Sequence, residues 1–132
     1  MNRTIDIVFR RILWIHIFVL LSYTQLHGGE IYLPQISFFA NSGVERVIED
    51  TGGSFTVEVG TLGSYTDYEF VESINATLSN SNWYWIQMES FTYIADQTGL
   101  ATFHVSANTN TSEHCFTLRA VNTSFIPIRQ LG

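Results

Sequence analysis

Cations are the scarcest feature of this 132-residue chain. It contains no lysine and six arginines, against twelve aspartates and glutamates. Without residues 1–29 the chain keeps three arginines and eleven carboxylates, a net charge of −8. So few cations cannot build the patch that neutralises phosphate groups on nucleic acid or on an anionic membrane. The sequence therefore predicts neither of these as a partner.

Cysteine is nearly absent as well. The single residue, Cys115, cannot form a disulfide within the chain, so a domain of about a hundred residues must be stabilised by its core. Apolar residues make up 45% of the sequence and aromatic residues 14%, which is ample for such a core. Cys115 begins an alternating stretch at 115–120, where we expect a small, half-buried thiol rather than a nucleophile or a metal ligand.

The first thirty residues differ from the rest of the chain. Arginines precede an apolar run at 12–21 that has the length of a signal-peptide core and about half that of a membrane span. We expect residues 1–29 to be a signal peptide, cleaved between Ser22 and Gly29. An uncleaved N-terminal anchor is the alternative. The remaining domain, residues 30–132, is then predicted to be secreted, periplasmic or at the cell surface, without membrane contact after cleavage.

Apolar and polar residues alternate over most of the remaining chain, as in a sheet with one buried face. Strands are predicted at 36–39, 44–48, 53–59, 67–72, 83–88, 100–107, 115–120 and 125–130. Turn-forming residues separate them, including a polar stretch at 75–82, and no segment shows a helical period. The predicted fold is all-β, an immunoglobulin-like two-sheet β-sandwich of about seven short strands, preceded by the signal helix.

Several landmarks follow one another in a recognisable order. They are a Gly-Gly turn leading into an alternating valine strand (52–59), a Trp-Ile-x-apolar strand (85–88), a Gly-x-x-x-Phe-x-Val-x-Ala-Asn segment (99–108) and a closing apolar strand followed by Gln and Gly (126–132). This order resembles that of BACON domains, the Bacteroidetes-associated carbohydrate-binding, often N-terminal modules. The resemblance covers roughly residues 36–132.

Two positions depart from the family pattern. BACON domains usually place an arginine a few residues after the Ala-Asn, where this chain has His114 and Cys115. They often carry an earlier tryptophan, where this chain has Tyr65, Tyr68 or Phe70. The resemblance implies a sandwich of secreted or surface proteins, often found beside glycan-degrading or adhesive domains. The function it implies is weak binding of a carbohydrate, either a glycan or a mucin.

Glycan recognition needs flat aromatic faces beside polar groups. The candidate ligand-binding residues are Trp83, Trp85, Tyr65 and Tyr68. Trp85 has an alternative role as the buried tryptophan of the sandwich core, which would leave Trp83 at the rim or in a loop. The competing function is a structural or protein-interaction module of the cell envelope, with an envelope protein as partner and no sugar binding. The two hypotheses differ in whether Trp83 and the two tyrosines gather on one exposed surface.

The sequence offers little for catalysis. Paired carboxylates such as Glu69 and Glu72 lack the raised acid and flanking base that glycoside cleavage requires. His104 and His114 have no partners at metal-ligand spacing. We therefore expect no enzymatic activity, no metal and no cofactor.

Three Asn-x-Ser/Thr triplets fall in predicted loops. They begin at Asn75, Asn110 and Asn122. In a secreted eukaryotic protein each would be a credible glycan acceptor. In a bacterial or viral protein, a chain rich in Asn, Ser and Thr produces such triplets by chance.

Overall fold

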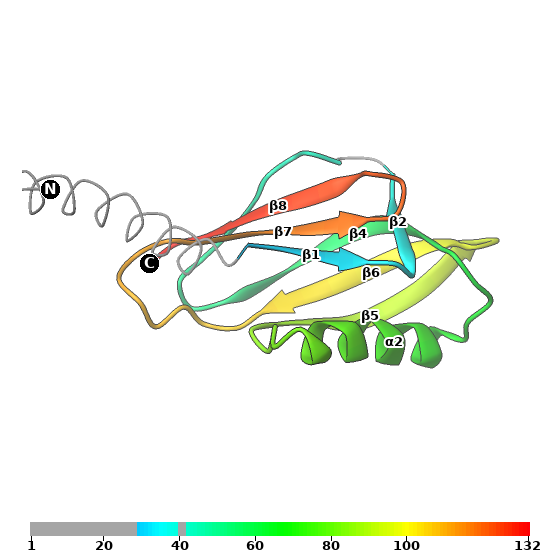
Figure 1. Ribbon diagram of the computed structural model, residues 1–132, viewed down its shortest axis with the longest axis horizontal. Helices are drawn as coiled ribbons and strands as arrows, with labels where there is room; N and C mark the ends of the chain where they lie inside the picture. The colour runs from blue at the N-terminus through cyan, green and yellow to red at the C-terminus, as the bar shows by residue number, and fades with distance from the viewer. Residues whose placement is uncertain (1–28, 40–41) are drawn as a thin grey trace, which may run out of the picture.

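The computed structural model describes residues 29–39 and 42–132, which form two four-stranded sheets and one helix (Figure 1). Buried side chains from both sheets belong to one core, so the sheets stack as a β-sandwich. The prediction of a mostly β, two-sheet architecture is confirmed. The predicted signal peptide or anchor at 1–29 lies outside the described residues, except for Gly29, which begins the first strand.

Sheet A combines the two ends of the described chain. Its strand order is β1 (Gly29–Leu33), β7 (His114–Ala120), β8 (Phe125–Gln130) and β3 (Arg46–Ile48). β7 and β8 form an antiparallel hairpin, whereas β1 pairs with β7 and β3 pairs with β8 in parallel. The two N-terminal strands therefore form the edges of a sheet whose centre is C-terminal.

Sheet B is antiparallel throughout. Its order is β2 (Ile36–Phe38), β4 (Gly53–Thr61), β6 (Thr98–Val105) and β5 (Ile86–Ala95). Side chains on β4 and β6 alternate between core and solvent, as a sheet with one wet face requires. β5 is interrupted by two irregularities of register, after Met88 and after Tyr93.

Helix α2 (Asp67–Asn80) corrects the sequence prediction of a strand at 67–72 and a turn region at 75–82. Its buried residues are Phe70, Ile74 and Leu78, which recur every fourth position. That spacing places them on one face of a helix. Their burial stabilises the helix despite its high content of Asn, Ser and Thr, residues that favour turns when unpacked.

The N-terminus of α2 is closed by a capping box. The Thr66 hydroxyl accepts a hydrogen bond from the Glu69 backbone N–H at 3.1 Å, and the Glu69 carboxylate accepts one from the Thr66 N–H at 3.4 Å. The helix lies along β5, an edge strand of sheet B, and also contacts β1, an edge strand of sheet A (Figure 1). It therefore covers the open side of the sandwich between these edges.

Two further differences concern strand boundaries. β1 was not predicted, because Gly29 falls within the expected signal peptide and the four residues after it are too few to show a pattern. β5 continues to Ala95, well beyond the predicted end at 88. Seven predicted strands overlap observed ones, namely 36–39, 44–48, 53–59, 83–88, 100–107, 115–120 and 125–130.

Pro127 explains where β3 begins. The amides of Phe125, at the start of β8, and of Leu131, directly after its end, donate toward the β3 side, to Ser42 Oγ at 3.0 Å and to the Ile48 carbonyl at 2.9 Å. Alternate residues of a strand face the same neighbour, so Pro127 lacks its donor on that same side. Regular pairing with β3 accordingly starts one residue later, at Ile128 opposite Arg46.

Candidate ligand site

The structure divides the four predicted ligand-binding aromatics into two groups. Tyr65 and Tyr68 lie at the N-terminus of α2, whereas Trp83 and Trp85 follow its C-terminus. A helix of 14 residues is about 21 Å long at 1.5 Å per residue. The four side chains therefore do not gather on one exposed surface.

The tryptophan pair belongs mainly to the core. Trp83 is 7% exposed, lies 4.9 Å from Trp85 between ring centroids and meets Phe116 edge-on at 5.6 Å. Trp85 is half-buried and meets His114 edge-on at 5.1 Å. The Trp83 indole thus has no open face. Trp83 is also more buried than Trp85, whereas the alternative prediction placed Trp85 in the core and Trp83 at the rim or in a loop.

Tyr65, in contrast, lines a surface pocket of about 230 Å³. The pocket lies where the segment between β4 and α2 meets the β5–β6 hairpin. Its lining residues are Gly63, Ser64, Tyr65, Tyr93, Ala95, Asp96 and Gln97. Tyr65 is therefore the one predicted site residue that lines this pocket, and exposed Tyr68 follows three residues later in the first turn of α2.

Contacts on several sides hold Tyr65 in place. Its ring meets Phe70 edge-on at 5.5 Å between centroids, and its backbone carbonyl accepts a hydrogen bond from the Tyr93 hydroxyl at 3.0 Å. A Cβ atom placed on Gly63 would lie 3.0 Å from the Tyr65 ring, so the absence of a side chain there makes room for the ring. The aromatic wall of the pocket is preorganised in this way.

The opposite wall is the β5–β6 turn. Gln97 adopts a left-handed backbone conformation, with φ of 54°, and its carbonyl accepts a hydrogen bond from Thr61 N–H at 2.9 Å. This bond ties the turn to the end of β4. Asp96 and Gln97 are exposed there, which leaves a carboxylate and an amide at the mouth of the pocket.

Several polar groups of the pocket are available to a ligand. Within the described part of the chain, the side chains of Ser64, Tyr65, Asp96 and Gln97 make no hydrogen bond. The Tyr93 hydroxyl is already engaged, because it also lies 3.4 Å from Thr61 Oγ1. The pocket therefore combines an aromatic ring with a free carboxylate, an amide and two hydroxyls.

Sequence reasoning did not assign Tyr93, Asp96 and Gln97 to a site. They lie about thirty residues from Tyr65. Tyr93 is on a strand that was predicted to end at 88, and Asp96 and Gln97 are in the turn that follows this strand. The available signal was the Asp-Gln-Thr-Gly turn directly after an aromatic segment, which places polar side chains at the tip of a hairpin.

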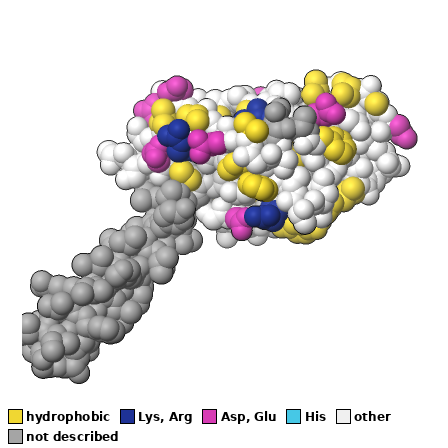
Figure 2. All heavy atoms as spheres, turned by 90° about the horizontal axis from the view of Figure 1, so that it is seen from above, with side chains coloured by type: hydrophobic (Ala, Val, Ile, Leu, Met, Phe, Trp, Pro, Cys, Tyr) yellow, Lys and Arg dark blue, Asp and Glu magenta, His cyan; other side chains and the backbone are white. Residues whose placement is uncertain are grey.

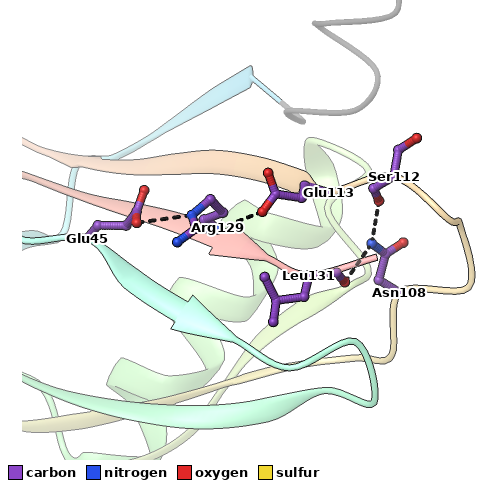
Figure 3. Close-up of polar contacts among 6 residues, drawn as sticks. All are labelled: Glu45, Asn108, Ser112, Glu113, Arg129 and Leu131. Atoms are coloured by element: carbon purple, nitrogen blue, oxygen red, sulfur yellow. Dashed lines mark hydrogen bonds and ion pairs between the residues drawn. The ribbon is translucent and has the colours of Figure 1, made fainter.

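A second hollow lies on the outer face of sheet A and is rimmed by ion pairs. Arg129 donates to Glu45 at 3.1 Å and to Glu113 at 2.7 Å (Figure 3). Figure 2 shows this face, where arginines lie directly against carboxylates. These bonds raise the pKa of Arg129, and the bond that it donates to Glu113 does so most strongly. Since the carboxylates already hold a cation of the chain itself, this hollow is a weaker candidate than the Tyr65 pocket.

Cys115 lies in this second hollow. Burial raises the pKa of its thiol, and the carboxylates of Glu113 and Glu45 raise it further, against a smaller opposing effect of Arg129. A raised pKa keeps the sulfur protonated near neutral pH, which is the opposite of what a nucleophile requires.

One further polar cluster lies on the outer face of sheet B. Ser54 Oγ and Glu89 Oε1 lie 3.1 Å and 3.5 Å from the same ring nitrogen of His104, Nδ1. A serine relay needs its serine and its carboxylate on opposite nitrogens of the imidazole, so this geometry is not a catalytic triad. The described residues contain no group of three or more His, Cys, Asp or Glu side chains placed to hold a metal ion.

Comparisons of the chain with protein-family models, with curated proteins and with solved structures find no match. In residues 29–39 and 42–132, no helix has the length and apolar character needed to cross a membrane.

Proposed function

We propose that this protein is a non-catalytic β-sandwich module that binds a carbohydrate weakly through the Tyr65 pocket. The observation that carries the proposal is the pairing of a fixed tyrosine ring with the free side chains of Ser64, Asp96 and Gln97. A sugar ring has apolar C–H faces that lie flat on an aromatic ring, and hydroxyls that bond to carboxylates and amides. Ligand sites commonly combine apolar walls with a few convergent polar groups in this way.

The size of the pocket sets the strength of binding. At about 230 Å³ it is smaller than the roughly 300–1,000 Å³ of pockets that enclose a drug-sized ligand, so it accommodates about one sugar ring. Twelve non-hydrogen atoms at about −0.3 kcal/mol each give about −3.6 kcal/mol, which corresponds to a dissociation constant in the millimolar range. Useful affinity then requires repeated contacts to a polymer such as mucin.

We also propose that the sandwich is immunoglobulin-like and related to BACON domains, and that it acts outside the cytoplasm or in the cell envelope. The order of landmarks between residues 52 and 132 supports the family, and the two four-stranded sheets are consistent with it. The apolar run at 12–21 supports export. The geometry of His104 and the protonated Cys115 support a role without catalysis.

A titration with sugars tests the proposed function. The protein would be titrated with monosaccharides and mucin-type oligosaccharides while amide resonances are followed by NMR. We expect saturable shifts around residues 63–65 and 93–97 at millimolar sugar. Tyr65→Ala and Asp96→Ala should each weaken binding by about tenfold, because each removes one wall of the pocket.

Tyr84→Ala is the matched control. Tyr84 is 63% exposed and lies beyond the other end of α2, so its removal should leave sugar binding unchanged. The absence of any shift with any sugar, or an equal loss in the Tyr84 variant, would disprove the proposal and favour an interaction module without sugar binding. Asp96→Ala changes only an exposed turn residue, so it remains informative if the Tyr65 variant is unstable.

A further inference from the structure

The Tyr65 pocket carries charge of one sign only. Asp96 is the only aspartate, glutamate, arginine or histidine among the residues that line it. Within the described part of the chain, the exposed Asp96 carboxylate makes no hydrogen bond and no ion pair. The other polar side chains at the pocket contribute hydroxyls and an amide. A ligand that enters the pocket therefore meets a negative charge that no group of the protein neutralises.

The cations of the protein lie elsewhere. The chain contains no lysine, and the three arginines in its described part all lie on strands of sheet A. Arg119 on β7 and Arg129 on β8 are bonded to glutamates, and Arg46 on β3 lies over the Phe55 ring. None of these arginines lines the Tyr65 pocket, which is formed by the β5–β6 hairpin and the segment between β4 and α2.

The N-terminus of α2 does not supply the missing positive charge. A helix N-terminus carries a partial charge of about +0.5, which attracts anions. The helix begins two residues after Tyr65, but Asp67 and Glu69 occupy its first turn. These two carboxylates outweigh the partial charge. This end of the molecule is therefore negative around the pocket.

A free carboxylate distinguishes uncharged sugars from acidic ones. It accepts charge-assisted hydrogen bonds from the hydroxyls of an uncharged sugar ring, which are stronger than bonds between neutral groups. An ionised carboxylate or sulfate on a sugar is itself only an acceptor, so it cannot donate to Asp96, and the two like charges repel. The hydroxyls and the amide of the pocket can bond to either kind of sugar and do not separate them.

We propose that the Tyr65 pocket selects uncharged sugars over acidic ones, and that the charge of Asp96 sets this preference. The acidic class comprises uronic acids, sialic acids and sulfated sugars. The inference rests on the proposed function, because it names the class of sugar that the same pocket takes.

Water limits the size of the preference, since Asp96 is exposed. Two like charges about 4 Å apart in water repel with an energy that corresponds to about a fivefold change in a dissociation constant. Salt weakens the repulsion, because the Debye length falls from about 30 Å at about 0.01 M to about 3 Å at about 1 M. We therefore expect a preference of about fivefold at low salt that nearly disappears at high salt.

Matched pairs of sugars test the preference. Galactose and galacturonic acid share one ring and differ only at C6, where a carboxylate replaces a hydroxymethyl group; glucose and glucuronic acid form a second pair. Titrations of the full chain, followed by NMR at residues 63–65 and 93–97, give a dissociation constant for each sugar. The acidic member of each pair should bind about fivefold more weakly at low salt, and the ratio of the two constants should approach one at about 1 M salt.

Asp96→Asn removes the charge and keeps the size of the side chain. The measured quantity is again the ratio of the two dissociation constants, because this variant also alters the bonds to the uncharged sugar. The ratio should fall from about fivefold to nearly one.

Asp50→Asn is the matched control. It removes the same charge from an exposed turn before β4, whereas the pocket lies beyond the other end of this strand. A strand of nine residues is about 30 Å long at about 3.3 Å per residue. Repulsion over that distance is roughly a seventh of its value at 4 Å, so this variant should keep the preference.

The outcomes separate this inference from the proposed function. If no sugar shifts any resonance, the proposed function fails and the preference fails with it. If uncharged and acidic sugars bind equally well at low salt, the proposed function stands and the preference is overturned. A preference that persists in Asp96→Asn, or that salt leaves unchanged, also overturns the inference, because the shape of the sugar at C6 would then set it.

Discussion

At the residue scale, the Asn75 side chain pairs with the backbone of Met88 as a residue of a neighbouring strand would. Its side-chain amide donates to the Met88 carbonyl at 3.0 Å, and its side-chain oxygen accepts from the Met88 N–H at 2.8 Å. This is the two-point pattern that a neighbouring strand would provide, offered by a helix to the edge strand β5. The expectation that Asn75 lies in a loop is therefore wrong, and a glycan on its nitrogen would break this pairing.

Asn75→Asp should lower the free energy of unfolding by about 1–3 kcal/mol, since a carboxylate would face the Met88 carbonyl without a donor. Urea denaturation monitored by circular dichroism measures this change. Asn110→Asp serves as the control, because Asn110 is exposed in the loop before β7 and should lose less than about 0.5 kcal/mol. Equal stabilities of the two variants would show that the Met88 bonds do not matter.

The second prediction at the residue scale concerns how the reactivity of Cys115 depends on pH. Because its pKa is raised, less thiolate is present near neutral pH than in an unperturbed cysteine, and the thiolate is the reactive form. Alkylation by iodoacetamide should be slower than for a free thiol at pH 7–8. The midpoint of its pH–rate profile should also lie higher. Unfolding in urea should restore ordinary reactivity, and faster reaction in the folded protein would contradict the prediction.

At the scale of elements, α2 shows how a helix escapes sequence analysis. The short segment 67–72 favours a strand, because the apolar Tyr68 and Phe70 alternate there with carboxylates. The Ser and Asn residues that follow favour a turn. Two helical signals were nevertheless present, the Thr66-x-x-Glu69 capping box and the fourfold spacing of Phe70, Ile74 and Leu78. Tertiary burial of these three side chains outweighs the weak local propensity.

Thr66→Ala tests the contribution of the cap. Loss of the hydroxyl leaves the Glu69 N–H without its partner and should destabilise the protein by about 1 kcal/mol, within the range of about 0.5–2 kcal/mol for such caps. Thermal unfolding measures the change. Ser79→Ala, an exposed change in the last turn of the same helix, should be close to neutral. A cap variant as stable as this control would mean that tertiary contacts alone fix the start of α2.

At the scale of the whole molecule, alternation predicted the sandwich because it is a local property of each strand. Phe55, Val57 and Val59 show their buried face without reference to any distant residue. The rule does not reach Trp83, because β5 begins only at Ile86, after a turn. Trp83 lies before that turn and is 7% exposed, although the predicted strand was expected to begin at this residue.

The candidate site could be predicted only in part. Tyr65 was proposed as an exposed aromatic, but its value as a site depends on Asp96 and Gln97, which chain folding brings to it from a distant hairpin. The spacing of residues in the sequence does not show that Asp96 and Gln97 lie near Tyr65, because their position depends on how far β5 and β6 extend before the turn. Pockets formed between elements are for this reason less predictable than strands.

The parallel pairing of β1 with β7 and of β3 with β8 affects how the chain folds as it is synthesised. The ribosome releases β1 and β3 well before their partners, β7 and β8. Contacts between such distant segments form slowly, because a long loop must close first. Sheet A therefore closes only after β7 and β8 have been synthesised, and until then the apolar residues of β1 are open to chaperones.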